Sequence, residues 1–193
     1  IGNTMMMAGM VAVISIPLSI SIGLFAAMHP GTSLDRIVTF CTLSTISVPE
    51  FFIATVMVLI LAVNLHWIPS TTYLTGDETF WQLLKAVAMP LITLVIVVSA
   101  QMIRMTRAGI LNVMNSPYIE MAILKGVPRK RIILHHTFYN AIGPVMKVIA
   151  LNLAYLVSGV VIVETIFSYQ GLAKLMIDAV QTRDLPIVQA CAM

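Results

Sequence analysis

The sequence predicts an all-α fold built from several helices that cross a lipid bilayer. Of the 193 residues, 59% are hydrophobic and only 10% are charged, and the mean hydropathy is +0.97. A soluble domain carries about a quarter charged residues, so this chain lacks the polar surface that would cover a core in water. A bilayer core requires about 20 apolar residues per helix, and runs of that length recur along the sequence. Residues 1–193 are therefore expected to form a single transmembrane domain.

The first predicted span covers residues 5–28. It lies within the stretch 1–34, which contains no Asp, Glu, Lys or Arg. The sequence His-Pro-Gly at 29–31 ends it, because proline and glycine together interrupt helices. The start of the chain carries no positive charge, which argues against a secretory signal peptide.

The second predicted span, residues 37–65, follows a short polar link and contains a single charged side chain, Glu50. Pro49 precedes this residue and is expected to kink the helix. A carboxylate in the middle of a span costs about 3 kcal/mol, so Glu50 is expected to face a water-filled path or a partner. A protonated Glu50, or one bonded to a neighbouring helix, is the alternative, and both interpretations remain open here.

Two more complete spans and one truncated span follow. Residues 66–84 combine aromatic, proline and acidic residues, as is typical of an interfacial loop. The third span is predicted at 85–103, the fourth at 141–163, and a truncated fifth begins at 186. Because the last apolar run is too short to cross a bilayer, we expect the chain to be a fragment of a longer subunit.

The positive charges predict the orientation of these spans. Six of the eleven basic residues lie in the stretch 101–140, against one acidic residue, Glu120. Loops rich in lysine and arginine remain in the cytoplasm, so this stretch is predicted to be cytoplasmic. By alternation, the link at 32–36 is also inside, and the loops at 66–84 and 164–185 are outside.

The cytoplasmic loop, residues 104–140, is predicted to form a helix, a turn and a second helix. Residues 118–125 are good helix formers, and Gly126 supplies the left-handed stop. Pro128 then suits the first turn of a new helix. The three basic residues at 129–131 are disfavoured there by the helix dipole, so lipid headgroups or the acids of a partner are expected to hold them. An equally open alternative is that these basic residues only determine the membrane topology of the chain.

Several motifs in this order resemble those of one family. The sequence E-M-A-x-x-x-G at Glu120–Gly126 resembles the E-A-A-x-x-x-G cytoplasmic loop of ABC importer permeases, with Met121 in place of an alanine. Residues 136–145 resemble the H-A-L-x-N-A-x-x-P-V sequence of the dipeptide, oligopeptide and nickel branch. Further matches to this branch are found at residues 31–36, 67–70, 159–167, 171–172 and 183–189. A departure is Gln170, which stands where the family usually has proline.

The resemblance implies a type I ABC importer permease in a bacterial cytoplasmic (inner) membrane. It implies a second permease subunit, two cytoplasmic ABC ATPase subunits and an extracytoplasmic solute-binding protein as partners. The implied cargo is peptides or similar small solutes, such as nickel complexes. The chain has no G-x-x-x-x-G-K-[ST] phosphate loop, so we expect no enzymatic activity, with ATP-Mg bound by the partner ATPase. Neither a cofactor nor nucleic acid is expected to bind this chain.

The resemblance assigns candidate residues to the coupling helix and to the outer surface, while polar residues within the predicted spans are candidates for the translocation path. The coupling helix that docks on the ATPase would comprise Tyr118, Glu120, Met121, Ala122, Lys125, Gly126 and Arg129. The translocation path would include Glu50, Asn152 and Ser158, although the last two equally suit contacts between spans. The surface facing the binding protein would include Glu164, Phe167 and Gly171, with a plain interfacial cap as the alternative. No histidine and cysteine spacing predicts a metal site.

An ion-gradient-driven secondary transporter or channel is the alternative function, with Glu50 as the coupling carboxylate. It explains the apolar spans but gives no reason for the basic helix-turn-helix loop. The resemblance leaves open the transported solute, and also whether the second permease subunit is identical to this chain or different.

Overall fold

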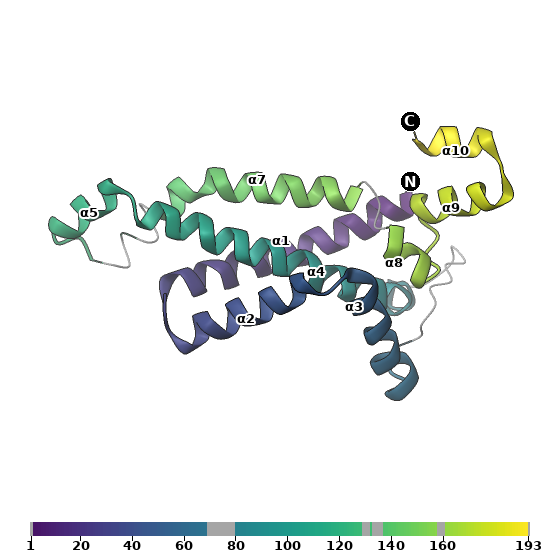
Figure 1. Ribbon diagram of the computed structural model, residues 1–193, viewed down its shortest axis with the longest axis horizontal. Coiled ribbons are helices and arrows are strands. Elements are labelled where there is room, and N and C mark those ends of the chain that lie inside the picture. Colours follow the sequence, from purple (N-terminus) through teal and green to yellow (C-terminus); the bar gives the residue numbers. More distant parts are fainter. Residues whose placement is uncertain (1, 69–79, 129–131, 133–136, 158–160, 193) are drawn as a thin grey trace. The chain divides into compact units, whose positions relative to one another are not determined.

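Every regular element in the described part of the chain is a helix. The computed structural model describes residues 2–68, 80–128, 132, 137–157 and 161–192. The elements are α1 (Gly2–Met28), α2 (Ser33–Ser47), α3 (Glu50–Met57), η1 (Val58–Asn64), α4 (Phe80–Met114), α5 (Pro117–Leu124), α7 (Phe138–Val157), α8 (Val161–Ile166), α9 (Leu172–Thr182) and α10 (Leu185–Ala192) (Figure 1). In η1 the helix widens, and Leu65 N donates to the oxygen of Ile60, five residues back, at 3.0 Å.

Among the residues that the structure describes, three helices are long and apolar enough to cross a membrane, and they correspond to α1, α4 and α7. A fourth crossing is obtained when α2 is counted together with α3 and η1 as one broken span. The fold class predicted from composition, an all-α polytopic membrane protein, is confirmed.

Pro49 breaks the second predicted span completely, where a kink was expected. α2 ends at Ser47 and α3 begins at Glu50, with Pro49 in an extended conformation between them. A proline inside a helix removes a backbone hydrogen bond and clashes with the preceding turn. Its carbonyl instead starts the new helix, accepting from Phe52 N at 3.0 Å and Ile53 N at 3.3 Å.

α4 is longer than the third predicted span. It continues beyond residue 103 to Met114, so the predicted cytoplasmic loop begins inside a helix. The reason is packing: Met102, Thr106 and Ile110 recur at intervals of four and are all buried, which extends the buried face of the helix. The two arginines at 104 and 107 therefore lie on a helix.

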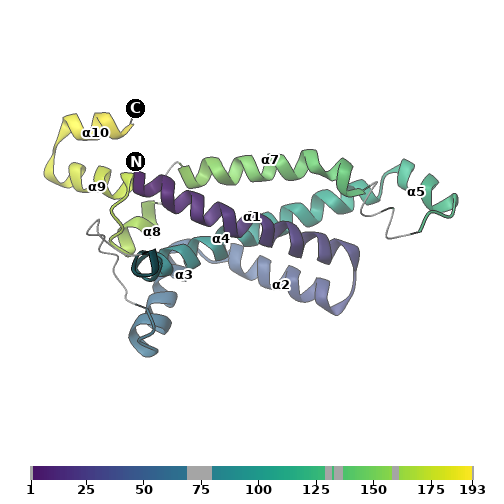
Figure 2. The same ribbon diagram turned by 180° about the vertical axis from the view of Figure 1, so that it is seen from behind.

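The chain divides into two compact units, and α1, α4 and α7 contribute to both. The first unit contains residues 1–14, 48–97 and 153–193. Within it α3 packs against α8, and α9 packs against α8 and α10 (Figure 1). The second unit contains residues 15–47 and 98–152, where the end of α1 and α2 form an antiparallel helix pair (Figure 2).

Small residues allow close helix packing in the second unit. Ala27, Ile110 and Ala141 are fully buried together, one each from α1, α4 and α7. A Cβ on Gly23 would lie 3.0 Å from the Cβ of Thr106. Small residues at such crossings are what allows membrane helices to approach closely. At Gly23, α1 and α4 therefore approach so closely that a Cβ would be crowded.

We expect Gly23→Val to destabilise the protein, whereas Gly9→Val on the same helix has little effect. A Cβ at Gly9 would meet no atom within 4 Å, while one at Gly23 meets Thr106. Overpacking of this kind costs about 1–3 kcal/mol. The measurement is thermal denaturation of the purified protein in detergent, and equal midpoint shifts in the two variants would contradict the prediction.

Candidate functional site

The predicted short helix and its left-handed stop are both present in α5. Ser116 is extended, Pro117 opens the helix, and Ile119 N donates to the Ser116 carbonyl at 3.0 Å. At the other end Gly126 has a φ of +75°. Its N–H donates to the Ile123 oxygen at 2.9 Å, and Val127 N donates to the Ala122 oxygen at 3.2 Å. These two bonds are the Schellman motif, which satisfies the carbonyls of Ala122 and Ile123.

α5 exposes most of its apolar side chains. Ile119 is buried, whereas Leu124 is 81% exposed, and Tyr118, Met121 and Ile123 are also exposed. An exposed apolar cluster on a short, well-capped helix is typical of a surface that another protein covers. We call the exposed side chains of Tyr118, Met121, Ile123 and Leu124 the α5 knob.

The polar candidates of this loop lie beside the knob. Glu120, Lys125 and Gly126 are exposed, and Ala122 is half-buried. Arg129 and most of the second predicted helix lie outside the described residues. The structure therefore places six of the seven predicted coupling residues on α5 and its cap.

Glu50 lies at a helix start, where the sequence had suggested the middle of a span. It is the first residue of α3, half-buried, and it accepts a hydrogen bond of 2.5 Å from the hydroxyl of Tyr155 on α7. A carboxylate is stabilised at a helix N-terminus by the helix dipole. The contact agrees with the interpretation in which Glu50 is bonded to a neighbouring helix.

Asn152 and Ser158 are the two other candidate residues for the translocation path. Asn152 is buried, and its amide donates to the Val148 carbonyl of its own helix at 2.9 Å. This bond satisfies the side chain within α7 and joins it to no second helix. Ser158 lies outside the described residues.

Glu164 caps α9 from inside the first unit. Its carboxylate accepts from Ala173 N at 2.9 Å and from Lys174 N at 3.1 Å. The hydroxyl of Thr4 donates to its other oxygen at 3.1 Å and accepts from Leu172 N at 2.8 Å. The first N–H groups of α9 thus donate to acceptors on two other helices, α1 and α8.

Tyr169 completes this cluster. It is fully buried, and its hydroxyl donates to the Asn3 carbonyl at 2.6 Å. Burial, and after it the negative charge of Glu164, raises the pKa of Tyr169 to about 12. The phenol is therefore a neutral donor that ties the start of α1 to the α8–α9 turn.

The surface that was expected to face a binding protein is interior in this structure. Glu164 and Phe167 are buried, and Gly171 is buried against the Glu164 carboxylate, where a Cβ would collide with it. Buried side chains present no contact surface to a second protein. In this structure Glu164 is an internal cap, with Phe167 and Gly171 buried near it, which differs from both the surface contact and the interfacial cap considered above.

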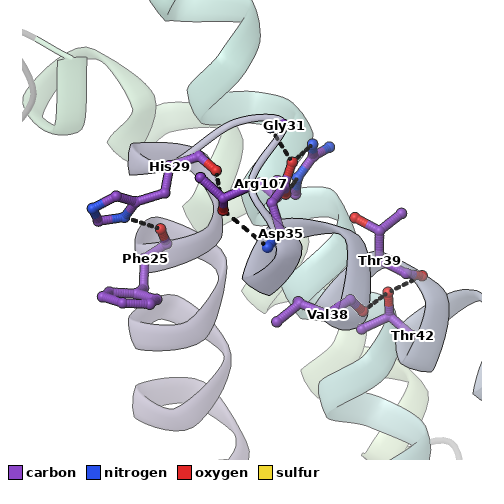
Figure 3. A network of polar contacts seen from close by, with 9 residues as sticks. Phe25, His29, Gly31, Asp35, Val38, Thr39, Thr42 and Arg107 are labelled. Atoms are coloured by element: carbon purple, nitrogen blue, oxygen red, sulfur yellow. Dashed lines mark hydrogen bonds and ion pairs between the residues drawn. The ribbon is translucent and has the colours of Figure 1, made fainter.

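An ion pair that the sequence analysis did not predict joins α2 to α4 within the second unit (Figure 3). Arg107 Nε donates to Asp35 Oδ1 at 2.6 Å, and Nη2 donates to Oδ2 at 2.8 Å. Gly31 N adds a third bond to the carboxylate at 2.9 Å. Asp35 is 4% exposed, and the Arg107 side chain is 25% exposed. The partners are far apart in the sequence, so no local spacing signals them.

No group of three histidine, cysteine or acidic residues that would hold a metal ion occurs in the described part of the chain. The two cysteines, Cys41 and Cys191, are free. The buried charged side chains described above form a helix cap and an ion pair.

We expect Gly171→Ala to destabilise the protein by about 1–3 kcal/mol, because the new methyl group displaces the Glu164 carboxylate from the N–H groups that it caps. Gly143→Ala is the control, since a Cβ there would point into open space. Thermal denaturation in detergent measures both. A Gly171→Ala variant as stable as Gly143→Ala would rule out the cap.

Known proteins share this sequence over most of its length. The family model described as "Binding-protein-dependent transport system inner membrane component" matches residues 19–193. The chain is 30% identical over 186 residues to "Probable peptide ABC transporter permease protein y4tP" of Sinorhizobium fredii, covering 96% of the chain and 59% of the relative. It is 30% identical over 190 residues to "Oligopeptide transport system permease protein AppB" of Bacillus subtilis, covering 97% and 60%.

A third relative, "Dipeptide transport system permease protein DppB" of Escherichia coli, is 34% identical over 195 residues, covering 88% of the chain and 57% of the relative. The chain thus spans somewhat less than two thirds of the length of these relatives. Since the family model covers nearly the whole chain and the helices are those of a membrane protein, the chain belongs to the family of binding-protein-dependent transport system inner membrane components, multi-pass proteins of the bacterial inner membrane.

Proposed function

We propose that the chain is part of the membrane-spanning subunit of an ATP-driven importer and contributes to a translocation path for peptides or similar small solutes. The observation that carries this proposal is the α5 knob, an exposed apolar cluster on a short helix closed by Gly126. Family membership supports it, and the relatives reported above are named as peptide, oligopeptide and dipeptide permeases.

In this proposal α5 is the coupling helix that docks in a cleft of a separate ATPase subunit. The ATPase binds ATP-Mg and hydrolyses it, and the α5 knob receives the resulting motion. A short helix whose two ends are both hydrogen-bonded moves as one body, which is the type of element that transmits a rigid-body displacement. The basic residues around it, among them Lys125 and Arg129, would hold acidic groups of the ATPase or lipid headgroups.

The proposed assembly has four kinds of component besides the lipid bilayer. They are this subunit, a second permease subunit, two ABC ATPase subunits and an extracytoplasmic solute-binding protein. Glu50 is proposed to line the path near the start of α3, held by Tyr155. A half-buried carboxylate there suits the recognition of a solute with a positive group, such as a peptide amino terminus.

The contrasting proposal is a secondary transporter in which Glu50 couples solute to an ion gradient. It accounts for a carboxylate held by a tyrosine, but it leaves the α5 knob without a partner. Purification of the complete transporter in mild detergent separates the two, because only the ATP-driven importer retains an ATPase.

We expect Leu124→Glu to abolish retention of the ATPase and to lower uptake by more than about tenfold, because a charge in the middle of an apolar interface remains unpaired on docking. Leu34→Glu is the matched control: Leu34 is 53% exposed and lies on the same predicted side of the membrane. The measurements are ATPase recovery with the purified complex and uptake of a labelled peptide. Normal recovery with Leu124→Glu would refute the docking role.

We also expect Gly126→Val to impair docking, whereas Gly126→Asn largely preserves it. A Cβ at Gly126 meets no atom within 4 Å, so only the left-handed φ of +75° opposes substitution. Asparagine tolerates this conformation, and a β-branched side chain does not. The same ATPase recovery assay distinguishes them. Equal recovery from both variants would show that the helix stop is not required.

A further inference from the structure

We propose that the ion pair between Asp35 and Arg107 is a mechanical link that carries the displacement of α5 to the α1–α2 turn. Arg107 would then be a positioning residue for transport. This inference rests on the proposed function, because it takes α5 as the docking helix. The juxtaposition that points to it is a bidentate pair between α4, which leads into α5, and the first turn of α2 (Figure 3).

The backbone between Arg107 and α5 is held by helical and turn hydrogen bonds. Arg107 lies about two turns before the end of α4 at Met114. The turn after it is hydrogen-bonded throughout: Asn115 N donates to the Leu111 oxygen, and Ser116 N to the Val113 oxygen, both at 3.1 Å. The carbonyl of Ser116 in turn accepts from the first turn of α5. A displacement of α5 is therefore passed to α4 directly.

The pair itself fixes orientation as well as distance. Two parallel N–H···O bonds between a planar guanidinium and a carboxylate resist rotation in a way that a single contact does not. The third bond, from Gly31 N, anchors the carboxylate to the α1–α2 turn, where Gly31 has a φ of +78°. The Asp35 carboxylate thus binds both α4 and the α1–α2 turn.

A role in topology alone does not account for this arrangement. Arg104 lies one turn earlier on α4, is exposed, and has no bonded partner among the described residues. It satisfies a requirement for cytoplasmic positive charge without a buried acid. Burying Asp35 is costly unless it is paired, so its pairing with Arg107 indicates a geometric requirement.

The apolar contacts around the pair explain why a polar link is useful. Thr106, beside Arg107, meets Gly23 of α1, and Ile110 packs on Ala27. Small side chains let the backbones of α1 and α4 approach closely. The ion pair adds a directional contact between α4 and α2. α2, whose first turn contains Asp35, then moves with α4, and its other end lies next to the Pro49 break.

The test uses the complete transporter, with its ATPase and binding protein, reconstituted in vesicles. The variants are Arg107→Met, Asp35→Leu, the double variant, and Arg104→Met as the control that removes the same charge from the same helix. For each we would measure recovery of the complex, its thermal stability, basal ATP hydrolysis, and labelled peptide taken up per ATP hydrolysed.

Arg107→Met is expected to be the least stable variant, because it leaves the buried Asp35 carboxylate unpaired. The double variant should regain stability, since no unpaired charge remains. Its uptake per ATP should nevertheless stay at least about fivefold below wild type, because the link is absent. Arg104→Met should resemble wild type in all four measurements.

Recovery of both stability and uptake per ATP in the double variant would overturn the inference, because the pair would then be only a folding contact. Additive losses in the double variant would also overturn it, since the two residues would then act separately. The proposed function is tested first, on wild type: a wild-type complex that retains no ATPase refutes that function, whereas a coupled wild type with a coupled double variant refutes only the link.

Discussion

The buried carboxylates of this apolar chain require bonded partners, and this constraint organises the structure. In a hydrocarbon environment an unpaired charge is costly, and both Asp35 and Glu164 are buried where other elements satisfy them. Asp35 is satisfied by Arg107, and Glu164 by Thr4 and the N–H groups of α9. The contacts of Asp35 with Arg107 and of Glu164 with Thr4 join helices that are distant in the sequence. These two carboxylates thus connect helices that the local sequence does not bring together.

The two units use this constraint in different ways. In the first, the Glu164 carboxylate and the Tyr169 phenol close a short turn between α8 and α9 and attach it to the start of α1. In the second, Asp35 and Arg107 attach the α1–α2 turn to α4, the helix that leads into α5. The first arrangement is a cap on α9, and the second is the link that we propose carries displacement from α5.

The sequence predicted well those features that depend on neighbouring residues. The apolar composition predicted membrane helices, and the Tyr118–Gly126 segment predicted α5 with its left-handed stop, because a Schellman motif is a local structure. The sequence predicted less well the features that depend on contacts between residues distant in the chain. α4 continues to Met114 because Thr106 and Ile110 are buried by other helices, which no local pattern shows. The full break at Pro49, in contrast, is made by local bonds, since the N–H groups of Phe52 and Ile53 donate to its carbonyl.

The sequence by itself determined the class of protein, the apolar helices and the short helix α5 with its stop, because hydropathy, charge and helix-stop chemistry are properties of short segments. Only the tertiary structure determined which charged residues are buried and which groups they bind. It turned Glu164 from an expected surface contact into an internal cap, and it paired Arg107, one of several loop arginines, with Asp35. The physical reason is that the free energy cost of burying a charge depends on the group that pairs with it. The fold brings that group into contact with the charge.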